Sequence, residues 1–191
     1  AKRYAKNEDI IVSSDSKIIH TLSTKEKIKF IKRPKNISGD HSEVYFAVIH
    51  ALKKIKNSKK YKFIALLQPT SPIRPKNIIS NGIKILKKNR QFQNLIHLER
   101  LYLNVGTLYK KKEWKPMYKK LTRGQDIINQ FRPSGCLFLY STKDIENHKK
   151  FKKRKNYGYF SKKNIETVNI DREDDFLRLS YLLKNKNVRL N

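Results

Sequence analysis

Short apolar runs alternate along the chain with longer segments whose apolar residues recur at helical spacing. The runs predict strands at residues 9–12, 29–32, 63–67, 95–98, 137–140 and 166–170. The longer segments predict helices at residues 16–25, 43–56, 75–88 and 142–148, followed by a closing helix after residue 171. This alternation predicts one domain with an α/β layered fold around a largely parallel sheet.

The run at residues 63–67 is continuously apolar, which is typical of a central strand covered on both faces. Pro69 and Pro72 end it, and Pro75 is suited to the first turn of the next helix. Residues 99–129 break the rhythm, because they are rich in Tyr and Lys and show no clear period. We therefore expect this segment to leave the main sheet.

Polar residues cluster where three predicted strands end. They occupy residues 13–15, 68–74 and 169–171. Ligands of open α/β sheets bind beyond the carboxyl ends of the strands. The spacing therefore predicts a site for an anion and a metal at one edge of the sheet, without naming a substrate.

The formal net charge of +29 is the most unusual property of the composition. It raises the possibility of nucleic-acid binding. However, 34 of the 45 basic residues are lysines, spread along nearly the whole chain. A general bias towards Lys, Asn and Ile explains this better than a dedicated binding face, so we expect no specific nucleic-acid partner. A positive field also favours an enzyme with anionic substrates.

The remaining composition excludes several other classes of protein. No stretch approaches the roughly 20 apolar residues of a membrane span. Cys136 is the single cysteine, so no internal disulfide is possible, and we expect a small core residue in a cytoplasmic protein. The five histidines show no metal-ligand spacing.

The string Leu-Leu-Gln-Pro-Thr-Ser-Pro-Ile-Arg at residues 66–74 resembles the acylneuraminate cytidylyltransferases, also called CMP-sialic acid synthetases. Four further blocks resemble the same family in the same order. They are Ile-Ile-Val-Ser-Ser-Asp at 10–15, Arg-Pro with Ser-Gly-Asp at 33–40, Phe-Arg-Pro-Ser-Gly at 131–135 and Ile-Asp-Arg-Glu-Asp-Asp-Phe at 170–176. The resemblance runs over nearly the whole chain.

The resemblance implies a three-layer, Rossmann-like nucleotidyltransferase domain over residues 1–191. The reaction it implies is attack of the anomeric hydroxyl of a nonulosonic acid on the α-phosphorus of CTP, with Mg²⁺ holding the phosphates. Residues 99–129 resemble the family's dimerisation segment, which implies a homodimer. Related enzymes for an eight-carbon sugar acid fit the 68–74 string less well.

The same resemblance implies roles for individual residues. The residues that it implies for binding the sugar are Gln68, Arg132, Arg123, Ser134 and Gly135. The two arginines would bind the sugar carboxylate. Nucleotide contacts fall to Ser13, Asp15, Arg33 and Asp40. Asp171 is the expected catalytic metal ligand, and Asn169 stands where the family usually has a second aspartate. Its carbonyl oxygen can still ligate a metal, but one negative charge is lost.

Several of these residues also have purely structural interpretations. Asp171 and Asp40 can cap the helices that follow them. Ser71 and Arg74 can support the loop that holds Gln68, and Tyr157 and Tyr159 can serve packing.

Family members begin with a strand and a loop of the form Ala-Arg-x-x-Ser-Lys, followed by Lys-Asn, which wraps the CTP phosphates. Nothing before Asp9 resembles that loop. We therefore expect that an N-terminal piece is missing and that these 191 residues alone turn over CTP poorly. Two alternatives to the enzyme stay open: a non-catalytic remnant, and a basic nucleic-acid-binding α/β protein.

Overall fold

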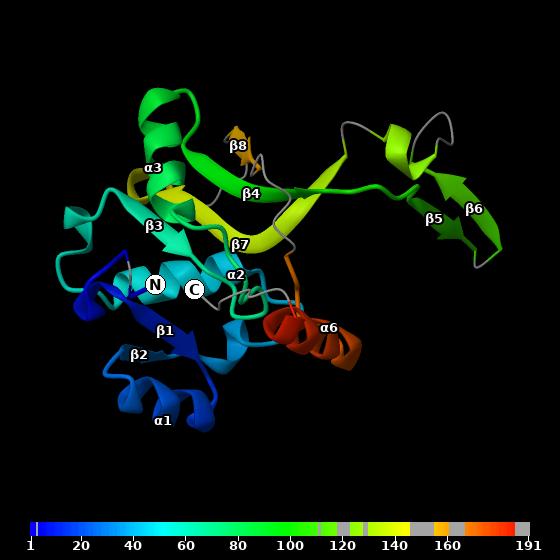
Figure 1. The fold of residues 1–191 in the computed structure, drawn as a ribbon. Coiled ribbons are helices and arrows are strands. Elements are labelled where there is room, and N and C mark those ends of the chain that lie inside the picture. Colours follow the sequence, from blue (N-terminus) through cyan, green and yellow to red (C-terminus); the bar gives the residue numbers. More distant parts are fainter. Residues whose placement is uncertain are drawn as a thin grey trace.

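The computed structural model describes residues 1–2, 4–110, 112–117, 123–127, 130–145, 155–160 and 167–185. Its strands are β1 (Ile11–Ser14), β2 (Lys29–Lys32), β3 (Phe63–Leu66), β4 (Asn94–Arg100), β5 (Gly106–Tyr109), β6 (Glu113–Pro116), β7 (Phe131–Ser141) and β8 (Asn156–Tyr159). Its α-helices are α1 (Lys17–Lys25), α2 (Val44–Lys53), α3 (Ile78–Lys88), α4 (Thr142–Ile145) and α6 (Glu173–Asn185). Figure 1 shows this arrangement.

The main sheet has four strands in the order β3-β7-β4-β8. Strand β7 runs antiparallel to both β3 and β4, whereas β4 and β8 are parallel. Strands β3, β4 and β8 therefore share one direction, and β7 is the exception. Strands β1 and β2 form a separate parallel pair. The predicted α/β fold with a mostly parallel sheet is confirmed.

Helices cover both faces of the main sheet. Leu137 and Leu139 pack with Ile78 and Leu86 of α3 in one buried cluster. The intervening Phe138 and Tyr140 pack on the other face, in a cluster with Tyr45, Val48 and Leu52 of α2. Since successive side chains of a strand point to opposite faces, β7 supplies both clusters. The result is the predicted three-layer arrangement (Figure 1).

Strand β7 differs from the sequence-based expectation. We expected residues 131–135 to form a polar block ahead of a short strand, but they are the first five residues of an eleven-residue strand. The ladder with β4 continues through them, with a register shift between Ile96 and Leu98. Gly135 makes this possible, because its φ of 73° lies in the left-handed region that side chains disfavour.

Other boundaries also differ. Helix α2 ends at Lys53, and α3 begins at Ile78 rather than Pro75. Strand β8 was not predicted, and residues 167–170 are not a strand, although the Ile170 amide donates to the Thr70 carbonyl at 2.8 Å. Strand β3, expected at the centre, pairs with β7 alone among the described strands.

Two peripheral elements complete the fold. Strands β5 and β6 form a hairpin that projects from the body of the domain, within the segment 99–129 that was expected to leave the sheet (Figure 1). Helix α6 packs Leu179 and Leu182 against Ile73 and Val168. Within the described ranges, no helix combines the length and the apolar character that crossing a membrane requires.

Candidate active site

The loop at residues 68–74 is anchored on β7. The Gln68 amide donates to the Gly135 carbonyl at 3.3 Å, and Arg74 Nε donates to the Cys136 carbonyl at 3.1 Å. Arg74 also donates to the Gln68 carbonyl. Burial of this guanidinium lowers its pKa, because its charged form loses contact with solvent. Arg74 is therefore the loop support that the sequence suggested.

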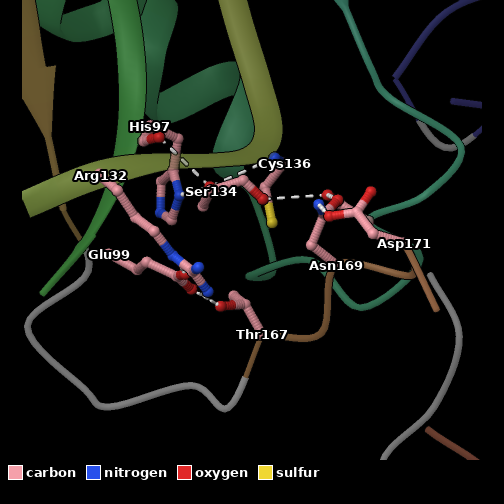
Figure 2. Close-up of polar contacts among 9 residues, drawn as sticks. His97, Glu99, Arg132, Ser134, Cys136, Thr167, Asn169 and Asp171 are labelled. Carbon is pink, nitrogen blue, oxygen red and sulfur yellow. Dashed lines mark hydrogen bonds and ion pairs between the residues drawn. The ribbon is translucent and has the colours of Figure 1, made fainter. Parts of the chain in front are cut away.

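Ser71 links this loop to the segment that carries Asn169. The Ser71 side chain is fully buried, and its hydroxyl lies 2.9 Å from the Ser134 carbonyl and 3.2 Å from Asn169 Oδ1. Asn169 Nδ2 in turn donates to Asp171 Oδ2. Figure 2 shows Asn169 and Asp171 side by side, next to β7.

The side-chain contact at the start of α6 comes from Asp175, which lies inside the helix. Asp175 Oδ2 accepts from the backbone amides of Asp171 at 3.1 Å and Arg172 at 3.0 Å. These amides precede the first turn of α6 and would otherwise lack partners. The Asp171 carboxylate is exposed and lies just ahead of this helix.

Arg132 lies on the same side of β7, paired across the sheet with Glu99 of β4. Glu99 accepts from Arg132 Nε through one carboxylate oxygen and from the Thr167 hydroxyl through the other. Glu99 therefore joins Arg132 to the segment that leads into Asn169 and Asp171 (Figure 2). Because the guanidinium carries five N–H donors, the contact with Glu99 at Nε leaves its terminal edge for a second acceptor.

Ser134 and His97 form the buried base of this cluster, each 3% exposed. His97 Nδ1 lies 2.7 Å from Ser134 Oγ, which also accepts from the Cys136 amide at 3.2 Å. Desolvation lowers the pKa of His97 to about 4, against a smaller opposing effect of Glu99. His97 is therefore neutral at physiological pH and holds Ser134 in place. Burial likewise raises the pKa of the Cys136 thiol.

Other predicted residues lie outside this cluster. Arg33 donates to the Ser13 carbonyl at 2.5 Å, which joins β2 to β1, and Asp15 and Asp40 are exposed. Arg123 pairs with Asp126 at 2.7 Å. No contact given for the described residues joins these side chains to Gln68, Arg132 or Asp171.

Sequence reasoning missed Glu99, Thr167 and His97. Glu99 did carry a signal, because it is the only acidic residue between Glu43 and Glu113 in a strongly basic chain. A solitary carboxylate at the end of a predicted strand is a candidate partner for a functional cation. Thr167 and His97 carry no comparable signal.

The described residues do not contain a ready-made metal centre. No three His, Cys, Asp or Glu side chains among them gather in a way that would hold a metal ion. Asp171 supplies one exposed carboxylate, which suits a Mg²⁺ ion bound mainly through substrate phosphates. Asn169 fits that ion less well, because its amide nitrogen, not its oxygen, faces the carboxylate.

Comparison with known proteins supports the interpretation of these motifs. No family model matches the chain. An N-acylneuraminate cytidylyltransferase of Escherichia coli is 24% identical over 175 residues, which cover 88% of this chain and 40% of that protein. The enzyme of the same name from Streptococcus agalactiae serotype III is 24% identical over 177 residues, covering 90% and 42%. The chain thus spans about two fifths of the length of these relatives.

Solved structures of cytidylyltransferases share the fold. A CMP:2-keto-3-deoxy-manno-octonic acid synthetase complexed with CTP aligns with a TM-score of 0.63 and 9% identity, covering 92% of this chain and 80% of that chain. A 4-diphosphocytidyl-2C-methyl-D-erythritol synthase from Anaerococcus prevotii aligns with a TM-score of 0.59 and 12% identity, covering 93% and 79%. In its five ordered motifs and in the curated relatives that it matches, the chain thus resembles the acylneuraminate cytidylyltransferases, and its fold is the one that solved cytidylyltransferases share.

Proposed function

We propose that the protein transfers CMP from CTP to the anomeric hydroxyl of an acylneuraminate or related nonulosonic acid. The hydroxyl oxygen bonds to the α-phosphorus, the α–β phosphoanhydride breaks, and pyrophosphate leaves. The observation that carries the proposal is the placement of Gln68, Arg132 and Asp171 around one short stretch of β7. The names of the curated relatives support the sugar acid as the acceptor.

Arg132 is the proposed partner of the sugar carboxylate. Its side chain is 58% exposed, so a ligand can reach it, while Glu99 fixes its Nε edge. The planar donor fork of a guanidinium matches a planar carboxylate in a way that an ammonium does not. Gln68, held by its backbone at the end of β3, offers both a donor and an acceptor to sugar hydroxyls.

Asp171 is the proposed ligand of Mg²⁺. When bound, that ion would neutralise charge on the phosphates during transfer. Arg33, Asp40, Ser13 and Asp15 are proposed to contact the nucleotide from the β1–β2 side. The net charge of +29 adds a field that attracts both anionic substrates.

A homodimer is the proposed assembly. Leu108, Tyr109 and Trp114 of the β5–β6 hairpin are between 45% and 58% exposed. A lone two-stranded hairpin is marginally stable in water, so these side chains require a surface to pack on. We propose that a second copy supplies it and that Arg123 approaches the site of that copy.

The decisive test is pyrophosphate release from CTP by the full-length protein, with N-acetylneuraminate, legionaminate, pseudaminate and the eight-carbon acid supplied separately. Release only with nine-carbon acids supports the proposal. Release only with the eight-carbon acid would reassign the substrate. Binding of DNA or RNA that weakens steeply with salt, without release with any acid, would favour the nucleic-acid alternative.

Replacing Arg132 by alanine is expected to raise the KM for the sugar acid about 30-fold, because a charge-assisted hydrogen bond contributes about 2 kcal/mol. Arg132→Lys should recover only part of this, since lysine keeps the charge and loses the fork. The KM for CTP should stay within about threefold in both variants.

Arg90→Ala is the matched control, because Arg90 is an exposed arginine just ahead of the opposite end of β4. It also tests whether the loss of any one positive charge weakens binding. Equal effects of Arg90→Ala and Arg132→Ala on the KM for the sugar acid would refute the assigned role of Arg132.

A further inference from the structure

We infer that Asn169 is a positioning residue that orients Asp171 through its amide nitrogen, and is not itself a metal ligand. The inference rests on the proposed function only in treating Asp171 as the residue that meets the cation. It departs from the expectation that Asn169 takes the place of a second ligand and offers its oxygen to the metal.

The orientation of the Asn169 amide follows from its contact with Asp171. Ser71 Oγ lies 3.2 Å from Asn169 Oδ1, and Ser71 is fully buried with no freedom to withdraw. Its backbone is fixed as well, because the Ser71 amide donates to the Gln68 carbonyl at 3.1 Å. The Ser71 hydroxyl has a single hydrogen, which the Ser134 carbonyl at 2.9 Å also accepts, so it tolerates Asn169 Oδ1 without fixing the amide. The Asp171 carboxylate can only accept, and Asn169 Nδ2 is the atom that donates to it.

The reverse orientation is unfavourable without a cation. It would set Asn169 Oδ1 against the Asp171 carboxylate, so that two acceptors face each other with no hydrogen between them. The lost hydrogen bond and the repulsion between two acceptors disfavour this reverse orientation. In the observed orientation the amide supplies that hydrogen itself. The Asn169 N–H group therefore lies where a cation would bind if two oxygen ligands faced each other.

An aspartate at position 169 would behave differently. Both neighbouring side chains would then be acceptors, and a divalent cation between them would relieve their repulsion. With asparagine at position 169 this repulsion is absent, and the hydrogen bond from Asn169 holds Asp171 in place without a metal ion. The protein is thus expected to bind a free divalent cation weakly, through one carboxylate.

The test is titration of the purified protein with Mn²⁺ alone, followed by water-proton relaxation. Asn169→Ala should leave the affinity for Mn²⁺ within about twofold of wild type, since no ligand is removed. Asn169→Asp should raise it at least about tenfold, because a second carboxylate joins the site. Binding that is detectable in Asn169→Asp and too weak to detect in the other two proteins also supports the inference.

Two results would overturn it. A loss of affinity of about fivefold or more in Asn169→Ala would contradict the inference, because the Asn169 donor competes with the cation for Asp171 Oδ2 and its removal is not expected to weaken cation binding. An unchanged affinity in Asn169→Asp would show that the cation does not bind beside this residue. In the metal-free protein, the side-chain NH₂ signals of Asn169 in a ¹⁵N correlation spectrum should shift in Asp171→Ala, and an unchanged position would also contradict the inference.

These measurements use neither CTP nor a sugar acid. They stay informative if the protein proves to be no cytidylyltransferase, and failure of the transferase assay would leave them unaffected. Unfolding temperatures of all variants, measured in parallel, separate a changed site from a damaged fold.

Discussion

Replacing Gly135 by alanine is expected to lower the free energy of unfolding by about 2–5 kcal/mol and to disable the site. A Cβ at this position would lie 2.2 Å from Ser71 Oγ and 2.6 Å from Gln68 Oε1. Both distances are far inside van der Waals contact. The φ of 73° adds backbone strain for any residue with a side chain.

The site would suffer because the two clashing atoms belong to it. Gln68 can swing its amide aside, but it then loses the position from which it would meet the sugar. Ser71 is fully buried and holds the Ser134 carbonyl, so it cannot move without breaking that contact. The alternative is a shift of β7 itself, which would carry Arg132 with it.

Urea unfolding followed by circular dichroism measures this effect. Gly39→Ala is the control, because the nearest atom to a Cβ there is Ser42 Oγ at 3.9 Å. It should unfold within about 1 kcal/mol of wild type. Adding Ser71→Ala to Gly135→Ala should restore part of the stability by removing the closest atom. A stable Gly135→Ala protein with wild-type affinity for substrate would contradict the interpretation of this glycine.

The stability of the protein is expected to fall by about 3 kcal/mol between pH 6.5 and pH 4 through His97 alone. Burial lowers the pKa of His97 from its usual 6.5 to about 4. Below pH 6.5 the unfolded chain takes up a proton at this residue, while the folded protein does not until about pH 4. The unfolded state therefore gains stability as the pH falls through this window, and above it the effect vanishes.

The free energy of unfolding should be measured by urea denaturation at several pH values for wild type and His97→Gln. Glutamine can still donate to Ser134 Oγ and does not titrate, so the difference between the two proteins isolates the histidine. The exposed His20 is the control, and His20→Gln should reproduce the wild-type slope. A wild-type slope that survives in His97→Gln would show that other groups cause it.

Much of the fold could be predicted from local pattern. The alternation of apolar runs and helical segments identified the whole of α1, β2, α2, β3 and α3 and most of β4, because these elements bury one face or both. Strand β8 was not predicted, because its sequence, Asn-Tyr-Gly-Tyr, has no aliphatic residue. Strand β7 was cut short because Pro133 and Gly135 suggest a turn, whereas the ladder with β4 keeps them in the strand.

The candidate site divides in the same way. Motifs in the sequence pointed to Gln68, Arg132, Asn169 and Asp171. The structure brings Arg132, Asn169 and Asp171 together beside β7 (Figure 2), and the Gln68 amide donates to Gly135 of the same strand. The side chains that orient these residues could not be predicted from the sequence. Glu99 meets Arg132 across 33 positions of the chain, and Ser71 meets Asn169 across 98. Contacts at such separations depend on strand order and register, which local pattern does not encode.

The sequence by itself determined the layered fold class, the resemblance to the acylneuraminate cytidylyltransferases and the types of side chain that the proposed chemistry needs. It could do so because burial periodicity and motif composition are local properties. Only the tertiary structure decided that Glu99 accepts from Arg132 and that Asn169 turns its nitrogen towards Asp171. It also decided that Asp175 accepts from the Arg172 amide just ahead of helix α6. The physical reason is that a hydrogen bond depends on the distance and direction between two atoms, and the packed sheet sets both.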